Sequence, residues 1–190
     1  MGLIIDKMVN NHSRLGVWKI EEEYDELLSK IRLNAEDLET LKGFKNYKRK
    51  LEWLSVRVLL NSLTKKNNVI VYNGNRKPFI ADRSYHISIS HSFHYSTVLI
   101  SSKSNVGIDI ERMQPKITHI AEKFINGREM PNIQSNKQIY HLYLHWCAKE
   151  ALYKMFDKRN IRFKNNIIIE PFHPKDEGRL VGKVLTEDIK

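Results

Sequence analysis

Apolar and polar positions recur in patterns that predict where the chain forms helices. In residues 46–63 and 139–156 the apolar positions return every three or four residues, as on the buried face of an amphipathic helix. Shorter stretches at 21–31 and 118–125 also predict helices. Asn34 is placed to cap one more, because its side chain can accept a bond from the first helical turn.

Short apolar stretches bounded by turn residues predict strands between these helices. The pair Asn73-Gly74, for example, marks a turn after one such stretch. Helices mixed with short strands, without regular alternation of strand and helix, indicate an α+β fold. The predicted strands are residues 15–19, 69–72, 86–90, 95–101, 106–111 and 167–169.

Length and composition exclude several classes of protein. The chain has 190 residues, of which 41% are hydrophobic and 28% charged, a globular balance with room for one domain or two small lobes. No apolar run approaches the ~20 residues needed to span a bilayer. We expect no secretory signal peptide, because Asp6 and Lys7 interrupt the short apolar start. The single cysteine, Cys147, excludes an internal disulfide and a multi-cysteine metal site. We therefore expect a cytoplasmic protein that is not bound to a membrane.

The chain is strongly basic, with 32 Lys and Arg against 22 Asp and Glu and a formal net charge of +10. Such an excess favours polyanionic partners, namely nucleic acid, phosphorylated metabolites or an acidic protein. Charge alone does not choose among them.

Two acidic residues lie two positions apart in segment 106–111, in which apolar and polar residues alternate. Side chains two positions apart in a strand share a face, so Asp109 and Glu111 should point the same way. At ~4 Å and an effective dielectric constant of ~20, their repulsion costs about 4 kcal/mol. A magnesium ion would remove that cost, since it prefers oxygen ligands. The alternative is a solvated acidic face on an exposed strand edge.

A second polar motif lies on the predicted helix 139–156, in the letters W-C-A-K-E-A-L-Y-K from Trp146 to Lys154. Glu150 and Lys154 are four residues apart and share a helix face, and Trp146 precedes Glu150 by one turn on the same side. Taken alone, this motif is also typical of a salt-bridged surface helix that is anchored by a core tryptophan.

Together the two motifs resemble a known family. G-I-D-I-E at 107–111, followed 35 residues later by the tryptophan motif, closely resembles the signature pair of the 4'-phosphopantetheinyl transferase superfamily. Phe124 with Glu129 is similar to a short element between them. Residues 74–78 and the letters S-I-S-H-S at 88–92 resemble upstream elements of the larger, two-lobed class, typified by the enzyme that activates surfactin synthetase.

The resemblance implies a fold of two pseudo-symmetric α+β lobes, here residues 1–104 and 105–190, with the metal-binding motifs in the second. Coenzyme A would bind in the cleft between the lobes, and the protein would be a monomer. After Lys154 the chain lacks a glycine-containing turn and one or two strands that the family has. We therefore expect a short C-terminal lobe, from either a truncated or a lean form.

Residue by residue, the resemblance implies magnesium ligation by Asp109, Glu111 and Glu150. Glu150 would also be the general base, directly or through a metal-bound water. Lys149 and Lys154 match lysines near the pyrophosphate, and Lys154 would assist catalysis there. Ser90 and His91 match residues that hold the 3'-phosphate, and Lys77-Pro78 match the segment beside the adenine. The residues implied for coenzyme A are Arg49, Arg57, Lys77, Pro78, Ser90, His91, Lys149 and Lys154, with Lys48 or Lys50 as alternatives to the arginines.

The function implied is a magnesium-dependent enzyme that transfers the 4'-phosphopantetheine group of coenzyme A to a serine of an apo acyl or peptidyl carrier protein, releasing 3',5'-ADP. Such phosphoryl transfer depends mainly on positioning and charge neutralisation. Carrier proteins of this kind are acidic near the acceptor serine, which suits the basic chain. Fatty-acid, polyketide and nonribosomal peptide biosynthesis all use such carriers, and the sequence does not choose among them.

Two other functions compete with this one. A magnesium-dependent nuclease of the D…E-x-K type has its lysine two residues after the glutamate on a strand, whereas Lys149 precedes Glu150 on a predicted helix. A nucleic-acid-binding protein would use the basic run 45–50 with its interleaved aromatic residue, but would not need the three acidic residues. His141 and His145 are spaced like a zinc pair, yet no third ligand is evident, and we predict surface or partly buried histidines.

Overall fold

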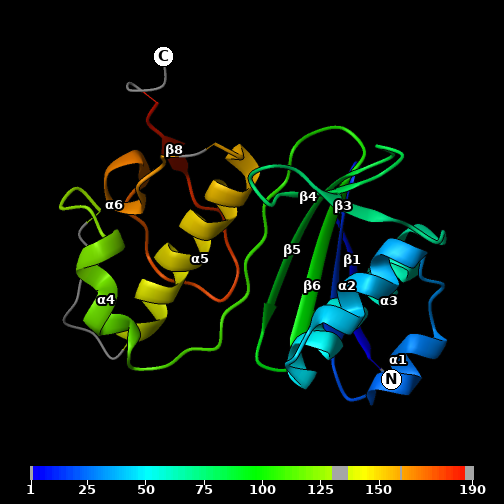
Figure 1. The fold of residues 1–190 in the computed structure, drawn as a ribbon. Coiled ribbons are helices and arrows are strands. Elements are labelled where there is room, and N and C mark those ends of the chain that lie inside the picture. The colour runs from blue at the N-terminus through cyan, green and yellow to red at the C-terminus, as the bar shows by residue number, and fades with distance from the viewer. Residues whose placement is uncertain (1, 130–136, 159, 187–190) are drawn as a thin grey trace. The chain divides into compact units, whose positions relative to one another are not determined.

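The computed structural model describes residues 2–129, 137–158 and 160–186 (Figure 1). By its internal contacts the chain divides into two compact units, a first unit of Met1–Ile110 and a second unit of Glu111–Lys190. Each unit combines helices with antiparallel strands, which confirms the predicted α+β class. The division falls at Ile110, whereas the sequence placed it at residue 104. The pseudo-symmetry of two lobes stays a prediction.

The first unit is built on a four-stranded antiparallel sheet with the strand order β1-β2-β6-β5 (Figure 1). Gly16 in β2 allows a helix to pack closely on it, because an added Cβ would lie 2.7 Å from Leu59 Cδ1. The strands of the sheet are β1 (Leu3–Asn10), β2 (Ser13–Lys19), β5 (His86–Ser92) and β6 (Tyr95–Ser101).

Three helices complete the core of the first unit. They are α1 (Tyr24–Ser29), α2 (Ala35–Gly43) and α3 (Tyr47–Thr64), and α3 packs against β2 and β6. The side chain of Asn34 accepts a bond from Asp37 N at 2.7 Å, so the predicted cap of α2 is confirmed. A separate two-stranded hairpin joins β3 (Ile70–Tyr72) to β4 (Pro78–Ile80). The largest fully buried core residues of this unit are Leu27, Leu41, Leu54, Leu59, Leu60, Ile80 and Ile87.

In the second unit, helices surround a small two-stranded sheet. The elements are α4 (Ile117–Phe124), α5 (Gln138–Phe156), α6 (Phe163–Asn166), β7 (Ile167–Ile169) and β8 (Gly182–Val184). Its apolar cluster comes from α4 and α5 and contains Ile117, Phe124, Leu142 and Tyr143. Among the described residues, no helix has both the length and the apolar composition needed to cross a membrane.

The structure differs from the predicted strands in two places. Residues 106–111 were predicted as a strand, but the structure assigns no strand there. Their backbone N–H groups at Ile108 and Ile110 bond to serine hydroxyls, not to the carbonyls of a neighbouring strand. Conversely, β1 was not predicted. Its residues are exposed on both faces apart from Leu3, so the apolar and polar positions do not follow a clear alternation.

Candidate active site

The first acidic residue of the motif, Asp109, lies at the end of the first unit and is held by β5. The Ser90 hydroxyl donates to Asp109 Oδ1 at 2.8 Å, and Ser90 Oγ accepts from Ile110 N at 3.4 Å. One step earlier, Ser88 accepts from Ile108 N at 3.0 Å. The segment that carries Asp109 is therefore fixed through side chains that project from one face of β5.

The second acidic residue, Glu111, opens the second unit and contacts α5. Trp146 Nε1 donates to Glu111 Oε1 at 3.3 Å. Glu150 and Lys154 follow Trp146 at intervals of four residues, so all three lie on the same face of α5. The exposed carboxylate of Glu111 is thus held beside the helix face that carries Glu150, which joins the two sequence motifs.

The donor chemistry of these carboxylates fits magnesium, which prefers oxygen ligands and often takes one or two carboxylates. Asp109 and Glu111 are both held by hydrogen-bond donors, as metal-binding carboxylates commonly are. Within the described parts of the chain, however, no three His, Cys, Asp or Glu side chains cluster closely enough to hold a metal ion. The magnesium site with Asp109, Glu111 and Glu150 stays a prediction.

Lys149 does not lie where the resemblance placed it. Its side chain has no solvent exposure, so its ammonium group cannot contact a bound pyrophosphate in this structure. Its Nζ instead donates within the second unit to the Glu129 carboxylate at 2.8 Å and to three backbone carbonyls. Burial lowers the pKa of Lys149, and the bond and charge of Glu129 oppose that shift. The carbonyl acceptors are those of Phe124 at 2.6 Å, Phe163 at 3.1 Å and Ile167 at 2.7 Å.

Glu129 completes this buried network. Its carboxylate accepts from Asn126 N at 2.6 Å and from Ile169 N at 2.7 Å, in addition to its ion pair with Lys149. The network therefore connects the end of α4, the middle of α5 and the strand β7. The short sequence element with Phe124 and Glu129 has a structural explanation, because both of these residues provide acceptors for Lys149.

The two histidines of α5 are buried, which shows that the prediction of surface or partly buried residues was wrong. His145 is 0% exposed and His141 is 6% exposed, and the ring of Phe172 contacts both rings. Burial lowers the pKa of His145 to about 3, and the positive charges of His141 and Lys149 add to the effect. The described residues provide no third ligand that would make a zinc site here.

The buried histidine predicts that the second unit loses stability in mild acid. The unfolded chain takes up a proton at His145 near pH 6.5, whereas the folded protein keeps the ring neutral down to about pH 3. Stability is therefore complete above about pH 6.5 and falls by up to about 1.4 kcal/mol per pH unit between these values. Urea unfolding followed by the fluorescence of Trp146, at several pH values, measures this slope.

His145→Phe is the matched variant, because it keeps an aromatic ring against Phe172 and removes the titrating group. The slope between pH 6.5 and pH 4 should become shallower in this variant. The change should be partial, since His141 also has a pKa lowered by burial and Glu129 and Lys149 lie nearby. An equal slope in both proteins would contradict the assignment to His145.

Two residues implied for the 3'-phosphate lie together in the first unit. Arg49 Nη1 donates to His91 Nε2 at 2.6 Å, and His91 Nδ1 lies 3.4 Å from a carboxylate oxygen of Glu52. Arg49 is exposed, and its Nη1 also lies 3.4 Å from a carboxylate oxygen of Glu52. The binding of a 3'-phosphate by Arg49 and His91 stays a prediction.

The other residues implied for coenzyme A differ in their surroundings. Arg57 is 3% exposed and forms an ion pair with Asp37 at 2.9 Å, so it is a core residue and cannot reach a phosphate in this structure. The Ser90 hydroxyl donates its hydrogen to Asp109. Lys77 and Pro78 are half-buried where the β3–β4 turn leads into β4, and they stay predictions for the adenine.

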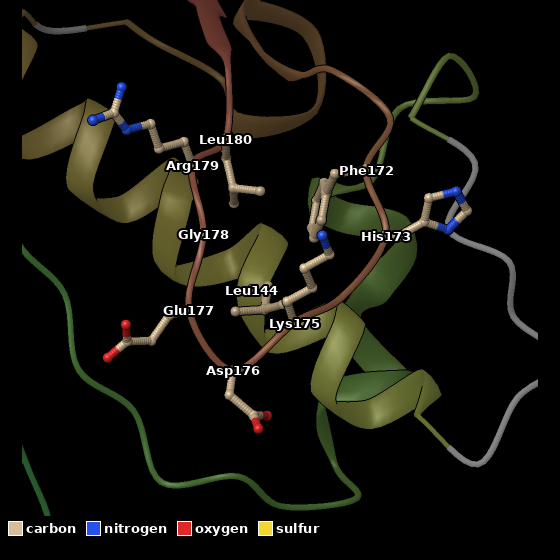
Figure 2. A pocket seen from close by; sticks show the side chains of 9 residues that line it. All are labelled: Leu144, Phe172, His173, Lys175, Asp176, Glu177, Gly178, Arg179 and Leu180. Atoms are coloured by element: carbon tan, nitrogen blue, oxygen red, sulfur yellow. The ribbon is translucent and has the colours of Figure 1, made fainter.

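A cavity of about 490 Å³ lies elsewhere in the second unit (Figure 2). Residues 172–180 pass over α5, and Phe172, Leu180 and Leu144 give the cavity an apolar lining. Charged residues also line it, among them Lys175, Asp176 and Glu177 (Figure 2). None of the residues implied for coenzyme A or metal lines this cavity.

Comparison with known proteins identifies relatives of the part that carries both motifs. Residues 105–188 match the model of the 4'-phosphopantetheinyl transferase superfamily. A 4'-phosphopantetheinyl transferase of Bacillus subtilis is 35% identical over 86 residues, 43% of this chain and 38% of that protein. The 4'-phosphopantetheinyl transferase gsp of Aneurinibacillus migulanus is 35% identical over 112 residues, 56% of this chain and 46% of that protein.

A more distant relative, the 4'-phosphopantetheinyl transferase AcpT of Salmonella typhi, is 29% identical over 112 residues, 56% of this chain and 58% of that protein. The matches thus span between about two fifths and three fifths of the length of these curated relatives. The matched segment includes Asp109 and Glu111 as well as α5 with Glu150 and Lys154. Residues 105–188 of this chain are therefore similar to the 4'-phosphopantetheinyl transferase superfamily, and these relatives carry that activity in their names.

Proposed function

We propose that this protein transfers the 4'-phosphopantetheine group of coenzyme A to a serine of an apo carrier protein. The observation that carries the proposal is the bond between Trp146 and Glu111 inside the segment that matches the superfamily. This bond places the carboxylate of Glu111 beside the face of α5 that presents Glu150. The two motifs that mark the family are therefore in contact in this chain.

In the proposed reaction, the carrier's serine oxygen forms a bond to the pantetheine-bearing phosphorus of coenzyme A. The bond from that phosphorus to the bridging oxygen breaks, and 3',5'-ADP leaves with the bridging oxygen. Glu150 accepts the serine proton, directly or through a water molecule. Lys154, one turn further along α5, offsets negative charge on the transferred phosphoryl group.

Asp109, Glu111 and Glu150 would hold the magnesium ion, which when bound neutralises and polarises the pyrophosphate. Arg49 and His91 would bind the 3'-phosphate, because they present an exposed cation and an imidazole ring within 2.6 Å of each other. Lys149 has no direct role with the substrate in this proposal. It supports the reaction by fixing α5, the helix that presents Glu150 and Lys154.

An acidic carrier protein fits the net charge of +10. Electrostatic attraction speeds the encounter of oppositely charged proteins and is screened by salt. The proposal therefore includes a carrier protein with a net negative charge.

The direct test is incubation of the protein with coenzyme A, magnesium and an apo acyl carrier protein, followed by mass spectrometry of the carrier. The expected result is an increase in the mass of the carrier that corresponds to one phosphopantetheine group. No increase is expected when EDTA removes the metal. A peptidyl carrier protein in a parallel reaction shows which carrier class is preferred. An unchanged mass for both carriers would contradict the proposed activity.

A further inference from the structure

The hydroxyl of Ser90 is placed to orient one of the proposed metal ligands. The Ser90 residue is 7% exposed, and its hydroxyl donates to Asp109 Oδ1 at 2.8 Å and accepts from Ile110 N at 3.4 Å. A serine hydroxyl has a single hydrogen to donate, and here that hydrogen is directed to Asp109. We propose that Ser90 is a positioning residue for the Asp109 carboxylate, and that it sets the affinity of the protein for the divalent cation. The inference rests on the proposed function, because it takes Asp109 as a metal ligand.

The geometry of β5 explains why this serine can have that role. Ser88 and Ser90 are two residues apart on β5, so they project from the same face. Their hydroxyls accept from Ile108 N and Ile110 N, which are also two residues apart. The backbone on both sides of Asp109 is thus fixed by serine side chains, and Ser90 also donates to the carboxylate.

Fixing the carboxylate in advance favours metal binding for an entropic reason. A side chain that is already ordered loses less conformational entropy when it binds a ligand. Removal of such a supporting hydrogen bond typically weakens metal binding by about 10–100-fold.

The resemblance implied another role for Ser90, a contact with the 3'-phosphate of coenzyme A. That role would need the hydroxyl to donate to the phosphate, whereas the structure directs it to Asp109. The two roles predict different results. Loss of a phosphate contact lowers the transfer rate only with substrates that carry the 3'-phosphate, such as coenzyme A. Loss of a positioned Asp109 lowers the rate equally with coenzyme A and with 3'-dephospho-coenzyme A.

The first experiment measures Mn²⁺ binding by electron paramagnetic resonance, with the full chain and no coenzyme A. Ser90→Ala is expected to weaken binding by about 10–100-fold. Ser90→Thr keeps the hydroxyl and should bind as the natural protein does. Ser88→Ala is the matched control, because it removes the bond to Ile108 N and leaves the bond to Asp109 in place. Ser90→Cys, with similar volume and a weaker donor, serves if the alanine variant does not fold.

The second experiment measures transfer to an apo carrier protein with coenzyme A and with 3'-dephospho-coenzyme A as donors. Ser90→Ala should raise the magnesium concentration needed for half the maximal rate, by the same factor for both donors. A loss confined to coenzyme A would overturn the inference in favour of a phosphate contact. Equal Mn²⁺ affinity in the natural protein and in Ser90→Ala would overturn it and leave the proposed function standing. Absence of Mn²⁺ binding by the natural protein would overturn both this inference and the proposed metal site.

Discussion

Replacement of Asp109 by asparagine is expected to lower the kcat/KM of phosphopantetheine transfer by about 1,000-fold. Asparagine has nearly the same shape, and its carbonyl oxygen can still accept the hydroxyl of Ser90, so the local structure should persist. What is lost is the negative charge. A metal ion contributes several kcal/mol of transition-state stabilisation, and about 4 kcal/mol corresponds to a factor of about 1,000 in rate. Steady-state kinetics with an apo carrier protein measures the effect.

Asp176→Asn provides the control for this experiment. Asp176 is exposed and lies in the segment 172–180, which contains none of the residues implied for coenzyme A or metal (Figure 2). The same change of charge there should leave kcat/KM close to that of the natural protein. Circular dichroism and the urea midpoint should be unchanged in both variants. Full activity in Asp109→Asn would rule out its assignment as a metal ligand.

Lys149→Met is expected to destabilise the second unit by about 3–5 kcal/mol. The substitution leaves the buried carboxylate of Glu129 without its ion-pair partner and removes the donor to three backbone carbonyls. Removal of one partner from a buried ion pair costs about this much, because the remaining charge stays in a poorly solvated site. Urea unfolding followed by fluorescence measures it, in a background in which Trp18 and Trp53 of the first unit are replaced by phenylalanine. Trp146 is then the remaining tryptophan and packs against Phe124 and Phe163, so the signal reports on the second unit.

Two further variants separate a structural role for Lys149 from a role in substrate binding. Lys123→Met removes an exposed lysine from α4 and should change stability by less than about 0.5 kcal/mol. Lys149→Met combined with Glu129→Leu removes both charges and should recover part of the lost stability. The structural role would be contradicted if Lys149→Met kept its stability but bound coenzyme A more weakly, because that result is what a pyrophosphate contact predicts.

Local sequence patterns predicted most of the regular elements, because they depend on interactions between close neighbours. The period of apolar residues in 46–63 and 139–156 corresponds to α3 and α5, and Asn34 and Asn46 cap the helices that follow them. The predicted strands at 86–90 and 95–101 form the hairpin of β5 and β6. The alternation in 106–111 was misleading, because a strand also requires a partner backbone, and here serine hydroxyls take that place.

The α+β class, most helix and strand positions, and the acidic and tryptophan motifs that resemble the superfamily could all be predicted from the sequence. Which charged side chains meet solvent depends on the packing of distant segments. Lys149 and Lys154 lie on one helix and are chemically alike, yet Lys149 is buried against Glu129, twenty residues away in the chain. Likewise Arg57 meets Asp37, and Ser90 meets Asp109. The physical reason is that periodicity reports the local backbone conformation, whereas the partner of a polar side chain depends on which distant segments pack against it.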